Sequence, residues 1–190
     1  MKLKSKIIIR LIASSFIIGC AQSYVNLGWL AWFGFIPVFK IFQQKINKKT
    51  IFFLGYIWGF SYHLSSLFWI AFNIGTTPLI AFLSMIGAIL YLSLFPASTF
   101  LVYNILYNHK KQSLLLFPSV WVIFEFIKTY GALSFPWSNL ANTQTGFFYL
   151  IQNVEYIGIN GICFWILLIN ITSYLLIKNH YNKRYILLLL

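Results

Sequence analysis

The chain has very few acidic residues: Asp and Glu together number 2 among 190 residues, against 14 Lys and Arg. These two residues are Glu125 and Glu155, and each lies in a stretch that is otherwise strongly apolar. An ionisable side chain at bilayer depth costs at least about 2.5 kcal/mol, so it normally faces a bundle interior, a water-filled cavity or an opposite charge. Both carboxylates therefore need a functional or a packing explanation.

Cysteine is equally scarce. Cys20 and Cys163 lie far apart within apolar runs, which gives neither a metal-ligand spacing nor a disulfide framework. We expect both to be small buried hydrophobes and expect no metal or other cofactor. A nucleophilic triad of Glu125, Lys128 and Cys163 is rejected, because apolar surroundings leave a thiol inert.

Charged residues of all kinds make up only 8% of the chain, whereas hydrophobic residues make up 60% and aromatic residues 21%. With a mean hydropathy of +0.80, this composition excludes an ordinary soluble domain and indicates an integral membrane protein. The net charge of +12 does not indicate nucleic-acid binding, because the basic residues fall in short clusters between apolar blocks.

The apolar stretches predict an all-α, polytopic membrane bundle in one domain over residues 1–190. A bilayer core of about 30 Å needs about 20 apolar helical residues, and six stretches approach that length. The expected spans are residues 7–24, 27–42, 51–72, 78–107, 113–131 and 151–177, with a seventh that begins at Tyr185. The second span is short, and the fourth is long enough to tilt or break.

The basic clusters predict the orientation. They precede span one and follow spans two, four and six, while the intervening loops carry no Lys or Arg. By the positive-inside rule this pattern predicts a multi-pass protein of the bacterial inner membrane with a cytoplasmic N-terminus, and only Lys128 falls outside it. The clusters are Lys2, Lys4, Lys6 and Arg10; Lys40, Lys45, Lys48 and Lys49; His109, Lys110 and Lys111; and Lys178, Lys183 and Arg184.

A competing interpretation of the N-terminus is a lipoprotein signal peptide that ends at Cys20. The residue three positions earlier is Ile17, where such signals usually have Leu, and another apolar span follows instead of a soluble domain. An uncleaved first helix is the more economical interpretation.

The longest uncharged connection, residues 132–150, is expected on the non-cytoplasmic face. Phe135, Pro136 and Trp137 predict a rigid aromatic turn, because proline fixes φ and holds the preceding residue extended. Trp137 suits either an interface anchor or a lipid contact. Ordinary solvation of a loop explains the polar residues that follow, although their concentration beside the aromatic turn favours a site. Those residues are Ser138, Asn139, Asn142, Thr143 and Gln144.

The two carboxylates have different local settings. Glu125 and Lys128 are three residues apart, which places them on one helical face and predicts an ion pair that fixes helix packing. Direct handling of a lipid or an amine is the alternative for this pair. Glu155 has no cation nearby in sequence, so it suits either a ligand contact or an exposed helix end.

Two features of the third span have structural explanations. His63 lies mid-span among serines, and an interhelical hydrogen bond is a better explanation for it than catalysis or metal binding. Gly55 and Gly59 form a GxxxG pattern, which permits a close helix contact but is too weak to indicate a dimer.

Three ordered segments resemble the membrane-embedded N-terminal part of bacterial apolipoprotein N-acyltransferases. The family's W-G-F stretch corresponds to residues 58–60. Its E-F-x-[RK]-G and G-F-P-W stretches correspond to residues 125–128 and 135–137, and its G-V-E-x-x-G stretch corresponds to Val154, Glu155 and Gly158. The departures are Ser134 and Asn153 at positions where the family has glycine, and Tyr130 before Gly131.

The resemblance implies transfer of an acyl chain from a membrane phospholipid to the α-amino group of the S-diacylglyceryl cysteine of a lipoprotein. The family's catalytic Glu, Lys and Cys lie in a nitrilase-like domain after the seventh span. We therefore expect no catalytic residue here and no turnover by this chain alone, with a separately encoded catalytic half as a possible partner. Trp137, Glu155, Phe135 and Pro136 are the expected lipid or substrate contacts.

Two alternatives to a part of an acyltransferase are kept. One is a membrane scaffold or lipid-binding remnant without enzymatic activity. The other is a small transporter, which is disfavoured because the sequence shows neither paired broken helices nor an inverted repeat.

Overall fold

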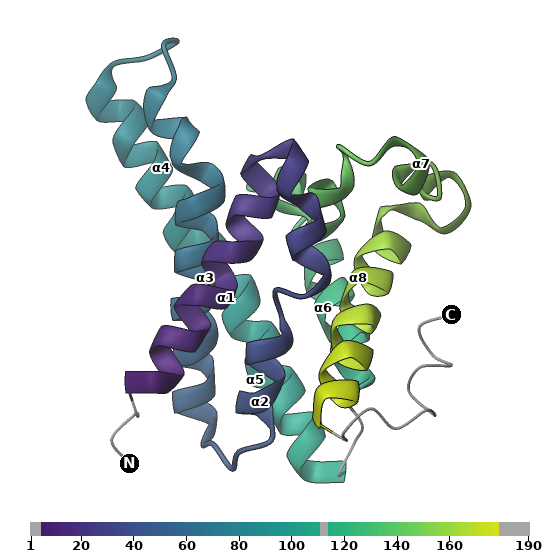
Figure 1. Ribbon diagram of the computed structural model, residues 1–190. Helices are drawn as coiled ribbons and strands as arrows, with labels where there is room; N and C mark the ends of the chain where they lie inside the picture. The colour runs from purple at the N-terminus through teal and green to yellow at the C-terminus, as the bar shows by residue number, and fades with distance from the viewer. Residues whose placement is uncertain (1–4, 111–113, 179–190) are drawn as a thin grey trace.

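The computed structural model describes residues 5–110 and 114–178, and in these two ranges the chain is helical and contains no strand. Figure 1 shows the helices packed side by side as a bundle. The α-helices are α1 (Ser5–Ser23), α2 (Ile36–Phe42), α3 (Lys48–Leu67), α4 (Pro78–Leu92), α5 (Leu94–Lys110), α6 (Leu116–Ile127), α7 (Phe148–Ile151) and α8 (Val154–Lys178). The 3₁₀ segments are η1 (Val25–Trp32), η2 (Phe68–Phe72), η3 (Pro136–Ser138) and η4 (Leu140–Gln144).

Four helical segments are long and apolar enough to cross a membrane: Ser5–Ser23, Lys48–Phe72, Pro78–Tyr107 and Val154–Lys178. Two apolar helical segments are shorter, Asn26–Phe42 and Leu116–Ile127. The all-helical membrane character is therefore confirmed, whereas six crossings stay a prediction. The expected seventh span lies outside the described residues.

The fourth expected span breaks into α4 and α5 at Ser93. Pro96 has no backbone N–H, and its ring disfavours a helical carbonyl at Leu92, so the helix is interrupted one turn before the proline. The Ser93 hydroxyl donates to the Ile89 carbonyl at 2.6 Å, a contact that often bends helices. Local sequence chemistry thus decides where this span changes direction.

The second expected span is also interrupted, between η1 and α2. A break at membrane depth leaves backbone groups that need partners from other helices. Asn170 of α8 accepts from the Phe35 N–H at 2.9 Å and donates to the Ala31 carbonyl at 2.8 Å. Ser14 of α1 donates to the Gly34 carbonyl at 2.5 Å. Two neighbouring helices therefore stabilise the break.

A third interruption lies inside α8, where Gly158 has φ 69° and ψ 172°. This positive φ suits glycine and separates the turn that carries Glu155 from the long helix beyond. From the sequence a break was expected at most in the fourth span, and paired broken helices were not expected; the interruptions of the second and sixth segments correct that expectation.

The Gly55 and Gly59 pattern brings α3 against α5. A Cβ added at Gly55 would lie 2.8 Å from Ala97 Cα, and one added at Gly59 would lie 3.0 Å from Ser93 Cα. Both distances are too short for a side chain without movement of the backbone. The close helix contact is thus internal to the chain.

Aromatic side chains fill the centre of the bundle. Phe35, beside the break in the second segment, stacks on Trp58 with ring centroids 5.1 Å apart and meets Trp121 edge-on at 4.9 Å. All three are buried. This core fixes α3 and α6 around the interrupted segment and so positions the loop that follows α6.

The two ends of the bundle differ in chemistry. Figure 1 shows α1 and α3 beginning, and α2, α5 and α8 ending, at one end, which we call the basic end. The described basic clusters of the sequence fall there, and Arg10, Lys40 and Lys178 line one hollow. The opposite end, which we call the loop end, carries η1 and α7. This separation fits the predicted orientation, which itself stays a prediction.

Candidate functional site at the loop end of the bundle

The aromatic turn lies directly after α6. Gly131, with φ 86°, allows the chain to reverse after the helix, and the Phe135 N–H donates to the Lys128 carbonyl at 3.0 Å. Pro136 then opens η3 after Phe135, whose φ is −140° and whose ψ is 81°. The turn is thus closed by its own backbone.

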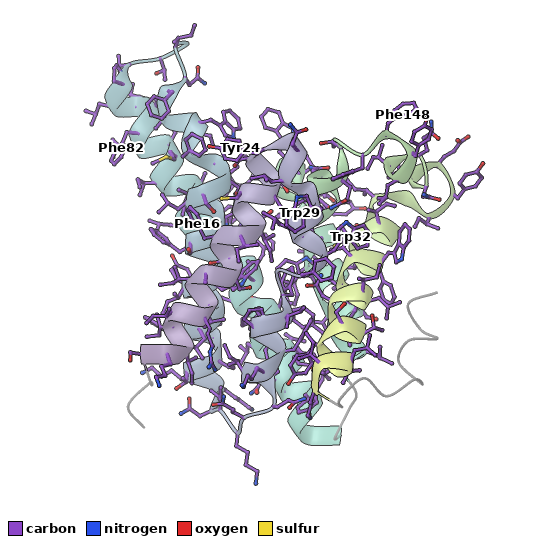
Figure 2. The ribbon with its side chains drawn as sticks, in the orientation of Figure 1. Phe16, Tyr24, Trp29, Trp32, Phe82 and Phe148 are labelled. Atoms are coloured by element: carbon purple, nitrogen blue, oxygen red, sulfur yellow. The ribbon has the colours of Figure 1, made fainter. Side chains whose placement is uncertain are left out.

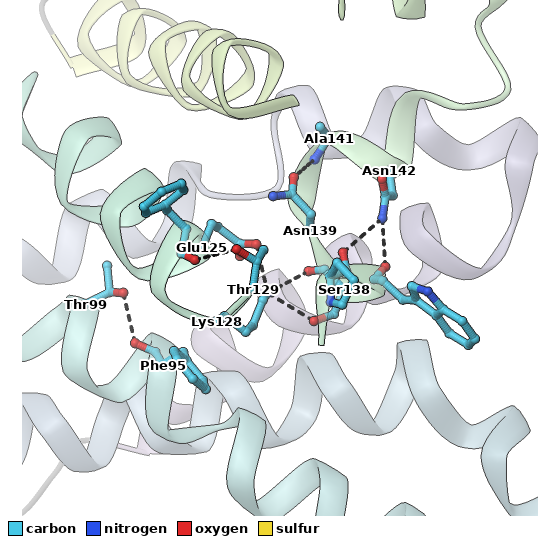
Figure 3. Close-up of polar contacts among 12 residues, drawn as sticks. Phe95, Thr99, Glu125, Lys128, Thr129, Ser138, Asn139, Ala141 and Asn142 are labelled. Atoms are coloured by element: carbon cyan, nitrogen blue, oxygen red, sulfur yellow. Dashed lines mark hydrogen bonds and ion pairs between the residues drawn. The ribbon is translucent and has the colours of Figure 1, made fainter. Parts of the chain in front are cut away.

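Lys128 joins the turn to the helix before it. Its Nζ lies 2.8 Å from Glu125 Oε2, and both side chains are almost fully buried. The same Nζ donates to the Ser138 carbonyl at 3.2 Å and to Ser138 Oγ at 3.1 Å (Figure 3). A buried charge needs partners of this kind, because desolvation otherwise costs several kcal/mol.

Tyr62 of α3 is a second donor to the same carbonyl. Its hydroxyl donates to the Ser138 carbonyl at 3.1 Å, and the tyrosine is only 3% exposed. The carbonyl therefore accepts from two helices. Tyr62 was not predicted from the sequence, where the neighbouring His63 is the more conspicuous polar residue.

Trp137 lies one residue before this anchor and points the other way. Its side chain is 63% exposed, while its carbonyl accepts from Gln22 Nε2 at 3.0 Å and from Asn142 Nδ2 at 2.9 Å. The indole stacks on Trp69 of η2 with ring centroids 5.9 Å apart. The backbone is fixed while the ring is presented to the surroundings.

Phe135 and Pro136 complete the turn beside Trp137. The Phe135 ring lies 6.1 Å from the Trp137 ring, centroid to centroid, and Phe135 is partly buried while Pro136 is exposed. The two residues therefore frame the exposed indole.

The polar residues after the turn are mostly not solvated, which corrects the solvation interpretation. Gln144 is fully buried: its Nε2 donates to the Gly28 carbonyl at 3.0 Å and its Oε1 accepts from Trp32 Nε1 at 2.9 Å. These two hydrogen bonds of Gln144 take the place of water and attach the loop to η1. Ser138, Asn139 and Thr143 are also buried, whereas Asn142 is partly buried.

Glu155 has a different setting from Glu125. It is exposed, on the turn before Gly158, and its N–H donates to the Gln152 carbonyl at 3.1 Å. Among the described residues no hydrogen bond, ion pair or ring contact joins it to Trp137. The structure thus does not bring the two principal candidates into one cluster.

His63 forms a hydrogen bond within its own helix. Its Nδ1 lies 2.8 Å from the Gly59 carbonyl, so the ring donates to the residue four positions earlier, and the expectation of an interhelical bond is wrong. The buried ring borders a cavity of about 10 Å³ beside Glu125 and Lys128.

The buried groups do not suit covalent catalysis. Ser138 and Lys128 lie within hydrogen-bonding distance, but Lys128 Nζ already contacts Glu125 Oε2 and the Ser138 carbonyl, and both residues are buried away from any substrate. Ser138 is also fully buried, as is Cys163 in α8. Lys128, Tyr62 and Ser138 instead hold the Trp137 turn in place.

These features define a helical membrane protein: its helices are long and apolar, the backbone groups at the interrupted spans are satisfied within the chain, and the aromatic loop is fixed. Residues 14–172 match the family of the apolipoprotein N-acyltransferase N-terminal domain, and the chain belongs to that family.

Its similarity to individual relatives is moderate. It is 28% identical to the apolipoprotein N-acyltransferase of Geobacter metallireducens over 153 residues, which cover 78% of this chain and 29% of that protein. It is 28% identical to the Rickettsia typhi enzyme of the same name over 83% of this chain and 32% of that protein. It is 26% identical to the Pasteurella multocida relative, over 93% of this chain and 35% of that protein. The chain thus spans about a third of the length of these relatives.

Proposed function

We propose that this chain is the membrane part of an apolipoprotein N-acyltransferase. The proposed reaction of the whole enzyme is transfer of a fatty acyl chain from a phospholipid to the α-amino group of the S-diacylglyceryl cysteine at the start of a lipoprotein. Membership of the family over residues 14–172 supports the proposal. The observation that carries it is the Trp137 turn, whose backbone is anchored by α1, α3 and α6 while its ring is exposed.

The role of the turn follows from its chemistry. An indole is amphipathic, and at the membrane interface it contacts the region where lipid head groups meet acyl chains. A turn that is held at Ser138 and at the Trp137 carbonyl loses little further conformational freedom when a lipid binds. We therefore propose Trp137, with Phe135 and Pro136, as lipid contacts, and Glu155 as a separate contact at the same end of the bundle.

The chemical step is assigned to residues outside this domain. Acyl transfer through a covalent intermediate needs an accessible nucleophile and a base, and the buried Ser138, Lys128 and Cys163 supply neither. We therefore propose that turnover requires a catalytic domain in addition to the described helices. We also propose an inner-membrane location with the basic end in the cytoplasm.

Complementation tests this function. The full chain is expressed with a nitrilase-like catalytic domain in a strain depleted of its own apolipoprotein N-acyltransferase, and lipoprotein N-terminal peptides are analysed by mass spectrometry. We expect triacylated peptide with both parts and only diacylated peptide with either part alone. Diacylated peptide in every arm, with the chain inserted in the membrane, would favour a scaffold without enzymatic function.

A further inference from the structure

A hollow of about 500 Å³ lies at the basic end of the bundle. Arg10 of α1, Lys40 of α2 and Lys178 of α8 line it, together with Tyr174 of α8. All three cations are exposed, so their charged groups are accessible to a molecule in the hollow. The tertiary structure thus brings cations from three helices to one place. The other lining residues are the apolar Ile36, Pro37 and Ile177.

These three cations have no acidic partner among the described residues. Of the two acidic residues of the chain, Glu125 already contacts Lys128 Nζ at 2.8 Å. Glu155 lies at the other end of α8, where about 30 Å of helix separates Gly158 from Lys178. Like charges around one hollow repel each other, so an anion from outside the chain would stabilise this arrangement.

Helix ends and membrane orientation explain only part of this cluster. Lys40 and Lys178 lie in the last turns of α2 and α8, where a cation interacts favourably with the helix dipole. The positive-inside rule requires basic residues near this end, but Lys45, which does not line the hollow, satisfies it equally well. Neither rule explains why Arg10, in the second turn of α1, lines the same hollow as the two lysines. The convergence of the three cations therefore points to a ligand.

A phosphate group matches the donors of this hollow. The guanidinium group of Arg10 can donate two parallel hydrogen bonds to phosphate oxygens, and each lysine is a compact cation with several donors. The Tyr174 hydroxyl adds a neutral donor, and the tyrosine ring packs against Phe39 with centroids 5.9 Å apart. A carboxylate has only two oxygens, and one arginine can occupy both. A group with more acceptor oxygens uses the cations of all three helices.

The hollow lies at the end of the bundle opposite the aromatic turn. Figure 2 shows Tyr24 and Phe148 toward the loop end. Trp137 belongs to that end, because its carbonyl accepts from Gln22, two residues before Tyr24. About 18 Å of helix separates Arg10 from Gln22 along α1. A ligand in the basic hollow therefore does not contact the residues proposed above for the acyl donor.

We propose that the basic hollow is an anion site that binds one phosphate group, held by Arg10, Lys40 and Lys178 and by the Tyr174 hydroxyl. The phosphate is carried by a soluble compound or by a head group at the membrane surface, and the same donors recognise both. Binding joins α1, α2 and α8 at the basic end and so stabilises the fold. The site goes beyond the proposed function, because it lies away from the Trp137 turn and requires no acyl transfer.

Thermal unfolding tests the site. The full chain is purified in a maltoside detergent and a phosphate-free buffer, and it is then titrated with inorganic phosphate. Sodium chloride keeps the ionic strength constant, so general screening of the charges does not change during the titration. A ligand that binds only the folded state raises the melting temperature as its concentration rises. We expect a saturable rise with phosphate and none with chloride alone.

The main variant combines Arg10→Gln with Lys40→Gln, which removes two of the three cations and changes only exposed side chains. We expect its affinity for phosphate to fall by about fivefold to twentyfold, the worth of two exposed ion pairs. The matched control combines Lys45→Gln with Lys49→Gln. Both lysines are exposed at the same end but outside the hollow, and the change in net charge is the same. The affinity of the control should stay within about twofold of the parent chain.

Phosphatidylglycerol distinguishes the two sources of the phosphate. If its addition to the micelles abolishes the response of the parent chain to inorganic phosphate, a head group occupies the site, whereas a response that persists assigns the site to soluble phosphate. No saturable rise in the parent chain, or equal affinities of the two double variants, would overturn the proposal. Because no acyl transfer is measured, those results would contradict only the anion site, and failed complementation would contradict only the proposed function.

Discussion

The side-chain oxygen of Asn170 accepts a hydrogen bond from the backbone N–H of Phe35, 135 residues earlier in the chain. The amide nitrogen of the same side chain donates to the Ala31 carbonyl on the other side of the break between η1 and α2. In a continuous helix this N–H would donate to this carbonyl, so the side chain of Asn170 bridges the two groups of one broken helical hydrogen bond. This contact lets the chain change direction inside an apolar bundle.

Asn170→Leu is expected to lower the free energy of unfolding by about 2–4 kcal/mol, because two buried backbone groups lose their partner. Denaturant titration in mixed micelles measures this change. Thr172→Val is the matched control, since the Thr172 hydroxyl bonds only carbonyls of its own helix, and it should cost less than about 1 kcal/mol. Equal costs for the two variants would show that the Asn170 bonds are not needed.

Lys128→Met is expected to destabilise the chain by about 3–5 kcal/mol, because it leaves the Glu125 carboxylate buried without its cation. The double variant Glu125→Gln with Lys128→Met removes both charges and should recover at least about 1 kcal/mol of that loss. The same unfolding titration gives both values. A double variant less stable than Lys128→Met would contradict the assignment of the pair to helix packing.

Gly55→Ala is expected to destabilise the contact between α3 and α5 by about 1–3 kcal/mol, because the added Cβ meets the backbone of Ala97. Gly87→Ala on α4 is the matched control, since its added Cβ has no atom within 4 Å. Without a clash, the control should gain up to about 1 kcal/mol from helix propensity. Thermal unfolding in detergent distinguishes the two variants. A lower melting temperature for Gly87→Ala but not for Gly55→Ala would contradict the prediction.

Gln144→Leu is expected to loosen the loop after the aromatic turn, because Trp32 Nε1 and the Gly28 carbonyl lose their partner. Amide hydrogen exchange in residues 28–32 and 140–144 should become at least about tenfold faster, which corresponds to about 1.4 kcal/mol. Thr145→Ala changes an exposed neighbour and should leave exchange near the parent rate. Exchange unchanged by Gln144→Leu would show that the Gln144 bonds do not hold the loop against η1.

The parts of the fold that depend on local chemistry could be predicted from the sequence. Long apolar stretches gave the helical membrane character, and the spacing of Glu125 and Lys128 placed two opposite charges on one helical face, where the structure pairs them. The fourth span, foreseen as long enough to break, is interrupted before Pro96. In each case the interacting groups lie within about one or two turns of helix.

The loop end of the bundle could not be predicted in the same way. The run from Ser138 to Gln144 has the composition of a solvated loop, and only contacts with Tyr62, Gly28 and Trp32 make it a buried segment. Asn170 could have been identified from the sequence, because a lone amide in the apolar run ILLINITSYLL needs a hydrogen-bond partner in a membrane. The identity of that partner was not in the local sequence.

The sequence by itself determined that this chain is an all-helical membrane protein with two unusual carboxylates and the motifs of its family. Only the tertiary structure decided that Glu125 is part of a buried anchor while Glu155 is exposed, and that cations of three different helices share one hollow. The physical reason is the distance along the chain between the residues that interact. Helix formation and insertion in a bilayer depend on neighbouring residues, whereas burial of a polar group depends on partners that the chain brings together from more than 100 residues away.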